Sequence, residues 1–182
     1  MVRAIGFVEF NSIAKGIEAT DHMLKSANVE VVTATPTCPG KYITLVHGDV
    51  AAVSNSVKSA EQLGGEFMTD SLVIPNVDEQ IFPAISCTTE IERIQAIGVI
   101  ESFAIPTLIE AADACVKAAD VALMEIRLGS GIGGKSFLIM TGDVSDINAS
   151  IDAGVSIIKD SGNLVNFVVI PSPHKNFKEI LI

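Results

Sequence analysis

The amino-acid sequence consists of two similar copies in tandem, and this internal repeat constrains the fold more than any other feature. When the chain is shifted by 92 residues, RAIGFVEF at 3–10 lies over QAIGVIES at 95–102. Between residues 4 and 31 the copies share 12 identities in 28 positions, far more than chance would give. The offset then becomes 94, so that Gly40-Lys41 lies over Gly134-Lys135. We therefore expect two tandem domains with the same fold.

Each copy has the pattern of a small α+β unit, in which strand-like runs of β-branched residues alternate with segments of helical spacing. We predict two ferredoxin-like-variant domains, joined by a linker at 77–93 that separates a first domain at 1–76 from a second at 94–182. The linker and the segment from Pro173 to Ile182 are expected to form short helices. The predicted order is strand, helix, strand, strand, helix, strand: 3–10, 13–26, 29–35, 42–47, 49–64 and 67–75 in the first copy, and 95–101, 105–119, 121–128, 136–141, 143–160 and 164–170 in the second.

Composition and charge exclude several classes of protein. The chain has 22 acidic and 12 basic residues and a formal net charge of −10, whereas a nucleic-acid-binding protein needs a basic face. Its 48% hydrophobic content is too high for a disordered chain and suggests apolar surface buried between subunits. No stretch reaches the roughly 18 uncharged apolar residues of a membrane span, and the first residues lack a signal-peptide pattern. We expect a cytoplasmic protein with no membrane or nucleic-acid partner.

Three cysteines have different expected roles. Cys115 stands where the first copy has Met23, which predicts core packing, and Cys87 in the linker is expected to be a free thiol. Cys38 lies in TPTCPGK, where two prolines stiffen the chain and Gly40 allows close backbone approach. A lone cysteine is usually inert. An iron–sulfur cluster needs three or four thiolates, so Cys38 could hold one only where a symmetry axis brings several copies together.

Other motifs are better explained by structure than by catalysis. Residues 129–136 fit the phosphate-loop formula G-x-x-x-x-G-K-[ST], but the apolar run that follows predicts a strand where that chemistry needs a helix. The acid pairs Glu18/Asp21 and Glu110/Asp113 repeat with the helices, which favours a structural or interface role. Glu9 and Glu101 are predicted to make a repeated hydrogen bond. No histidine site repeats, and the sequence offers no nucleophile–base pair or metal cluster within one chain, so we expect no enzyme.

The repeated motifs resemble the bacterial microcompartment shell-protein domain. The first copy reads AIGFVE, IEATDHMLKSANV and GKYITLVHGDV, and the second reads AIGVIE, IEAADACVKAADV and GKSFLIMTGDV. IPSPH at 170–174 is similar to the closing motif of that family, although Ser172 stands where arginine is common. This resemblance implies a trimer of tandem domains that imitates a hexagon and tiles with neighbouring shell proteins, and it implies edge contacts at Lys25 and Lys117.

TPTCPGK further resembles the tandem shell protein of the propanediol-utilisation type. That resemblance implies that three Cys38 thiolates hold one iron–sulfur cluster per trimer, of the [4Fe–4S] kind, at the threefold axis. It places Pro36, Thr37, Pro39 and Gly40 in the pore loop, and Gly131, Gly133 and Gly134 in a second central loop. The implied function is electron relay across a microcompartment shell in the cytoplasm, with a redox enzyme or electron carrier inside as partner.

Two alternatives stay open at this point. The first is a shell protein whose central pore is open to metabolites and holds no cluster. The second, from another class, is a small-molecule-binding or signalling trimer of ferredoxin-like units.

Overall fold

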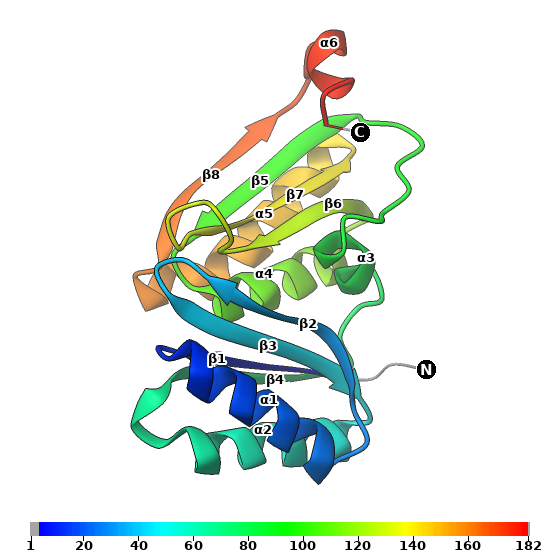
Figure 1. Ribbon diagram of the computed structural model, residues 1–182. Helices are drawn as coiled ribbons and strands as arrows, with labels where there is room; N and C mark the ends of the chain where they lie inside the picture. Colours follow the sequence, from blue (N-terminus) through cyan, green and yellow to red (C-terminus); the bar gives the residue numbers. More distant parts are fainter. Residues whose placement is uncertain (1–3, 182) are drawn as a thin grey trace. The chain divides into compact units, whose positions relative to one another are not determined.

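Each copy folds as a four-stranded antiparallel sheet with two helices packed on one face (Figure 1). The computed structural model describes residues 4–181. The first copy contains β1 (Ala4–Phe10), α1 (Ile13–Ser26), β2 (Glu30–Thr37), β3 (Lys41–Gly48), α2 (Val50–Gly64) and β4 (Met68–Pro75). The second contains β5 (Ala96–Ser102), α4 (Ile105–Ala118), β6 (Val121–Leu128), β7 (Ser136–Gly142), α5 (Val144–Ile158) and β8 (Leu164–Ile170). The predicted α+β class and element order are confirmed, and Arg3 of the first predicted strand lies outside the described residues.

The two sheets have the same strand order and the same register. The orders are β2-β3-β1-β4 and β6-β7-β5-β8. Ala4 pairs with Gly48 in the first sheet, and Ala96 pairs with Gly142 in the second. β2 is an edge strand, which is why it tolerates Pro36, a residue with no backbone N–H to donate. The duplication seen in the sequence therefore extends to backbone pairing.

Local sequence explains where the helices begin. The Ser12 side chain accepts a hydrogen bond from the Lys15 N–H and caps α1. α4 instead has Pro106 in its first turn, where the missing N–H would have no helical partner. Asp49 occupies the expected cap position of α2, but its side chain makes no capping bond.

The connecting and terminal segments form the short helices that we expected. α3 (Ile81–Ile85) follows β4, and α6 (Lys175–Lys178) follows β8. By contacts, one compact unit comprises the first copy to Val77 together with Gly129–Gly134, and the other comprises the rest of the chain from Asp78. None of the helices within residues 4–181 has the length and hydropathy that crossing a membrane requires.

Candidate functional site

Cys38 lies at the tip of the tight turn between β2 and β3. β2 ends at Thr37 and β3 begins at Lys41, so the turn contains only Cys38, Pro39 and Gly40. The Gly40 N–H donates to the Thr37 carbonyl at 2.9 Å, and Gly40 has a φ of +88°, a backbone conformation that favours glycine. The Cys38 side chain is half-buried, and the peptide bond to Pro39 is cis. Of the sequence-predicted pore loop, Pro36 and Thr37 are the last residues of β2.

The glycine-rich segment Gly129–Gly134 belongs to the same compact unit as this turn. The Cys38 N–H donates to the Gly129 carbonyl at 3.4 Å. A Cβ placed on Gly134 would lie 3.1 Å from the Cys38 carbonyl oxygen, and Gly134 has a φ of +80°. Gly131 and Gly133 also have positive φ values, of 75° and 68°. Glycine at position 134 thus permits close approach to the backbone that carries Cys38.

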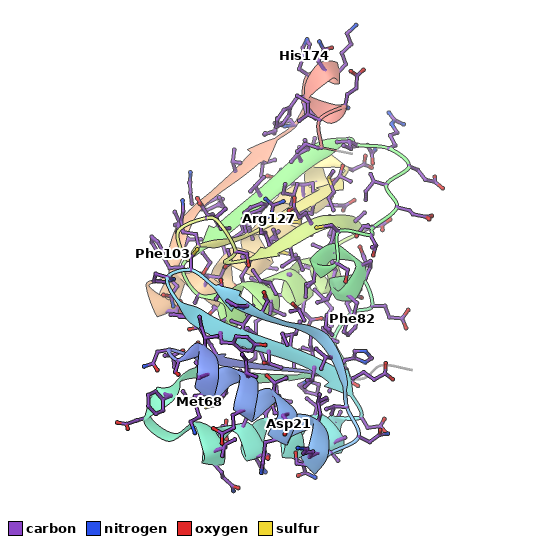
Figure 2. The ribbon with its side chains drawn as sticks, in the orientation of Figure 1. Asp21, Met68, Phe82, Phe103, Arg127 and His174 are labelled. Atoms are coloured by element: carbon purple, nitrogen blue, oxygen red, sulfur yellow. The ribbon has the colours of Figure 1, made fainter. Side chains whose placement is uncertain are left out.

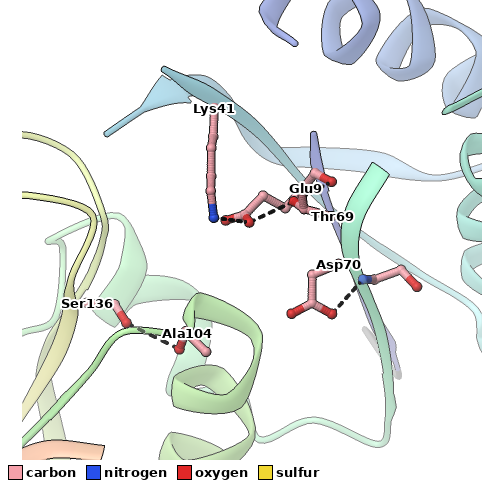
Figure 3. A network of polar contacts seen from close by, with 7 residues as sticks. Glu9, Lys41, Thr69, Asp70, Ala104 and Ser136 are labelled. Atoms are coloured by element: carbon pink, nitrogen blue, oxygen red, sulfur yellow. Dashed lines mark hydrogen bonds and ion pairs between the residues drawn. The ribbon is translucent and has the colours of Figure 1, made fainter. Parts of the chain in front are cut away.

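A buried ion pair holds the base of the turn. The Lys41 Nζ lies 2.6 Å from the Glu9 Oε1, and only 6% of Glu9 is exposed. The Thr69 hydroxyl donates to the same carboxylate oxygen at 2.8 Å and to the Glu9 carbonyl at 3.1 Å (Figure 3). A buried carboxylate is stable when it is paired and hydrogen-bonded in this way. Lys41 is therefore tied to β1 and β4 three residues after Cys38.

Asp70 lies beside this pair (Figure 3). Burial raises the pKa of the Asp70 carboxyl above 3.8, and the negative charge of Glu9 acts in the same direction. The Ser71 N–H, which donates to the Asp70 side chain at 2.8 Å, and the Lys41 charge lower this pKa but do not cancel the rise. Sequence reasoning missed Thr69 and Asp70, because β4 meets β1 only after about 60 intervening residues.

The second copy repeats the pair and removes the case for a phosphate loop. The Lys135 Nζ lies 2.5 Å from the Glu101 Oε1, so the repeated polar contact predicted for Glu9 and Glu101 is confirmed. Ser136, the last residue of the phosphate-loop formula, begins strand β7, as predicted. Its hydroxyl donates to the Ser102 carbonyl at 3.2 Å and to the Ala104 carbonyl at 3.4 Å, the second of which is drawn in Figure 3. Lys135 and Ser136 are therefore occupied in building the domain.

The other two cysteines lie in different environments from Cys38. Cys115 is fully buried, its Sγ donates to the Ser150 carbonyl at 3.1 Å, and burial raises the pKa of its thiol to about 12. This confirms its core role. Cys87 is exposed, with a φ of +53°. Among residues 4–181, no group of three His, Cys, Asp or Glu side chains within one chain could hold a metal ion.

The donor set around Cys38 fits a cluster only in an assembly of copies. A thiol is the ligand type that iron–sulfur clusters use, and Cys38 is half-buried on a short turn anchored at both ends. One chain offers one such thiol, so three copies would be needed to supply three. The Cys38 thiol thus fits in kind, and the number of ligands depends on assembly.

The predicted edge lysines are paired with carboxylates of their own helices. Lys25 Nζ and Lys117 Nζ each lie 2.5 Å from the carboxylate four residues earlier, on Asp21 and Asp113. Glu18 pairs with Lys15 at 2.6 Å. These acid residues are thus engaged with lysines, which agrees with the structural role that their repetition favours.

Comparison with known proteins shows the same duplication. The BMC domain model matches residues 4–77 and again residues 96–173. The bacterial microcompartment shell protein PduT of Citrobacter freundii is 42% identical over 176 residues, which is 97% of this chain and 96% of that protein. The carboxysome shell protein CcmK1 of Thermosynechococcus vestitus is 40% identical over 89 residues, which is 47% of this chain and 76% of that protein. These relatives are structural shell proteins rather than enzymes.

Two solved structures share this fold over most of the chain. The crystal structure of a microcompartment protein from Desulfitobacterium hafniense has 50% sequence identity and a TM-score of 0.94, covering 98% of this chain and 99% of that one. The fused permuted hexameric shell protein MSM0275 from the RMM microcompartment has a TM-score of 0.63 at 23% identity, covering 87% of this chain and 82% of that one. The second likeness concerns the fold alone.

Proposed function

This chain belongs to the BMC-domain family of bacterial microcompartment shell proteins, and from that membership we propose that three copies form a pseudohexameric shell tile with an iron–sulfur cluster at its centre. The tandem domains support the first part. Two similar units per chain give six units in a trimer, and a head-to-tail arrangement of similar surfaces can close into a ring. The tile would join neighbouring shell proteins, with Lys25 and Lys117 at its edges as the resemblance predicts.

The observation that carries the cluster proposal is the position of Cys38. Cys38 is half-buried on a three-residue turn, while Cys115 is fully buried and protonated. Three Cys38 residues around a threefold axis would supply three thiolate ligands to a [4Fe–4S] cluster. Such a group, when bound, supplies one-electron transfer across the shell. The chain's own residues place the thiol, because the Glu9–Lys41 pair and the Gly40–Thr37 hydrogen bond fix both sides of the turn.

The test is iron content under anaerobic conditions. We would purify the wild-type protein, Cys38→Ser and Cys87→Ser without oxygen, and measure iron and sulfide per chain with EPR spectra before and after dithionite. We expect roughly four irons per three chains in the wild type, as one [4Fe–4S] cluster per trimer requires. The iron should be lost in Cys38→Ser and kept in Cys87→Ser, which removes the exposed thiol as a matched control.

Two other results would favour the alternative functions. A trimer that holds no iron, even after reconstitution, would refute the cluster and favour the metabolite pore, with Pro36, Thr37, Pro39 and Gly40 as its predicted lining. A chain that fails to join a shell but binds a small molecule saturably would support the signalling alternative.

A further inference from the structure

The segment that follows β4 packs onto the second unit. In α3, the Ile81 and Ala84 side chains are 0% exposed. α3 lies against β6 and α4 (Figure 1). It therefore covers the edge strand of the second sheet and one flank of α4.

Hydrogen bonds fix this cover in place. The Asp78 N–H donates to the Asp113 Oδ1 on α4 at 2.9 Å. The Gln80 amide bridges two backbone groups of β6: its Nε2 donates to the Val121 carbonyl at 3.2 Å, and its Oε1 accepts from the Leu123 N–H at 3.0 Å. The segment thus satisfies backbone groups that an edge strand would otherwise leave open.

The segment that follows β8 is the counterpart of this cover. Ile74 pairs with Ile5, and Ile170 pairs with Ile97, so the two segments correspond at an offset of 96 residues. The Asp78 Oδ1 accepts from the Gln80 N–H at 3.0 Å, and the His174 Nδ1 accepts from the Asn176 N–H at 3.3 Å. The same offset aligns pairs of residues along the rest of the two segments: Val77 with Pro173, Ile81 with Phe177, and Ala84 with Ile180.

The two segments differ in what covers them. Ile81 and Ala84 are fully buried, whereas Phe177 is 40% exposed and Ile180 is 77% exposed. α6 extends beyond the sheet of its own unit (Figure 1), with His174 at its start (Figure 2). Two apolar side chains of the segment after β8 are therefore exposed at positions where the equivalent side chains of α3 are buried.

Among residues 4–181, no segment buries the corresponding flank of α1 in the first unit. Ile13 and Ile17 on α1 are 40% and 54% exposed, while the identical residues of α4, Ile105 and Ile109, are 3% and 0% exposed. The fold is the same at both places, so exposure in the first unit reflects a missing neighbour.

Two further positions show the same contrast. The Asp21 side chain on α1 (Figure 2) is 63% exposed, against 10% for Asp113. Val31 on β2 is 40% exposed, against 0% for Leu123 on β6. The exposed surface formed by Ile13, Ile17, Asp21, Leu24 and Val31 is called the α1/β2 surface below.

We propose that residues 174–181 of one copy dock on the α1/β2 surface of a second copy, in the way that α3 docks on α4 and β6. This inference rests on the proposed trimer and names the contact that closes it. Phe177 and Ile180 take the places of Ile81 and Ala84, and Asn176 faces the backbone of Val31 as Gln80 faces that of Leu123.

Charge and symmetry agree with this occupant. α6 carries Lys175 and Lys178, of which Lys178 donates to the Ile94 carbonyl of its own chain at 2.7 Å. The surface that α6 would meet carries Asp21, which pairs with Lys25, and Glu30, whose side chain is 84% exposed. Opposite charges favour this orientation over others. A C-terminal segment on one chain and its acceptor on the next make a head-to-tail contact, which is the kind that closes rings.

Cross-linking between distinguishable copies tests the contact. Asn176→Cys is placed in one tagged chain and Val31→Cys in another, both in a Cys38→Ser/Cys87→Ser background, and the two are co-expressed and treated with a short bismaleimide. We expect a covalent product that carries both tags, and none when either new cysteine is missing. Sedimentation of the untreated sample reports the trimer independently.

The outcomes separate the two proposals. A trimer that gives no product with both tags, or a double-cysteine chain that links only within itself, overturns the docking while the proposed trimer stands. A wild-type chain that sediments as a monomer overturns both.

Substitution of the exposed anchors gives a second readout. Phe177→Asp and Ile180→Asp should each weaken the trimer about tenfold or more, as the loss of an apolar anchor does. Neither should lower the melting temperature of the dissociated chain, because both side chains are exposed in it. Phe103→Asp, which changes a phenylalanine that is 59% exposed elsewhere, should leave the trimer intact. An unchanged trimer in both α6 variants would contradict the docking.

Discussion

The Glu9–Lys41 pair is repeated in the second copy, and in the first copy it supports the turn that carries Cys38. A carboxylate in the middle of an apolar strand is unfavourable unless a partner neutralises it. Lys41 and Thr69 supply that partner in the first copy, and Lys135 supplies it for Glu101 in the second. The lysine that follows the glycine in each copy is therefore explained by the carboxylate on the neighbouring strand.

Asp70 gives a test of this polar group at the residue scale. Its pKa is raised in the folded state, chiefly by burial, so folding favours the protonated form. Stability from this group is therefore present at low pH and is lost as the pH rises through the folded pKa. We expect Asp70→Asn to raise the melting temperature at pH 7, with a gain that shrinks toward pH 4. An equal gain at both pH values would exclude the proposed cause.

Cys115 gives a second test, in the alkaline range. Its thiol has a pKa of about 12 in the folded protein against an ordinary 9.0, so the unfolded chain ionises first as the pH rises. Between these values the free energy of unfolding should fall by about 1.4 kcal/mol per pH unit from this group alone. The measurement is urea unfolding of the wild type and Cys115→Ala from pH 8 to 11, where the difference between the two curves isolates the thiol.

Thiol labelling provides the check on that result. The thiolate is the reactive form, so Cys115 should resist iodoacetamide at pH 8 until the protein unfolds, whereas exposed Cys87 reacts at once. Mass spectrometry of the labelled peptides distinguishes the two. Rapid native labelling of Cys115 would mean that α4 and α5 open readily.

At the scale of the elements, the same core space is filled by a strand side chain in the first copy and by a helix side chain in the second. A Cβ on Gly16 of α1 would lie 2.6 Å from the Tyr42 ring of β3. The second copy has Leu108 on the helix and Ser136 on the strand at these positions, both fully buried. Interiors are close-packed, so a large side chain on one element requires a small one on the other.

A second position shows the same exchange. A Cβ on Gly64 would lie 2.6 Å from the Phe10 ring. The corresponding residues of the second copy are Ile158 and Ser102, which are both fully buried. The duplicated sheets and helices have thus kept their backbones while their core residues changed in compensating pairs.

This exchange predicts coupling between helix and strand substitutions. Gly16→Leu should destabilise the protein by about 1–3 kcal/mol through overpacking, and Tyr42→Ser should destabilise it by about 3–5 kcal/mol through the cavity it leaves. The double variant copies the second domain, so it should be more stable than the sum predicts, by about 0.5–3 kcal/mol. Urea unfolding of all four proteins measures this coupling, and strict additivity would show that the two sites do not share one space.

At the scale of the whole molecule, the duplication repeats the surfaces of the domain as well as its fold. A chain with two copies of one fold carries two copies of each surface, and α3 covers only one of the two corresponding edges. In the proposed docking, the C-terminal segment of a second chain covers the other edge, and the pattern of that segment matches the pattern of α3. Under the docking proposed above, this surface is covered only when the copies join.

The sequence alone determined the duplication, the order of strands and helices, the repeated pair at Glu9 and Glu101 and the core role of Cys115. These features follow from sequence patterns that are local or that repeat at a fixed offset, so they can be recognised without a structure. Thr69 and Asp70 could not be found in this way, because a hydrogen bond to Glu9 depends on the register of β4 against β1.

Only the tertiary structure decided which of two identical residues is buried. Ile17 and Ile109 occupy the same position in the same repeated motif, yet one is 54% exposed and the other 0% exposed. Helical periodicity places both on one flank of a helix, but burial depends on which distant segment packs against that flank. That information lies in long-range contacts between segments, which a local sequence pattern does not encode.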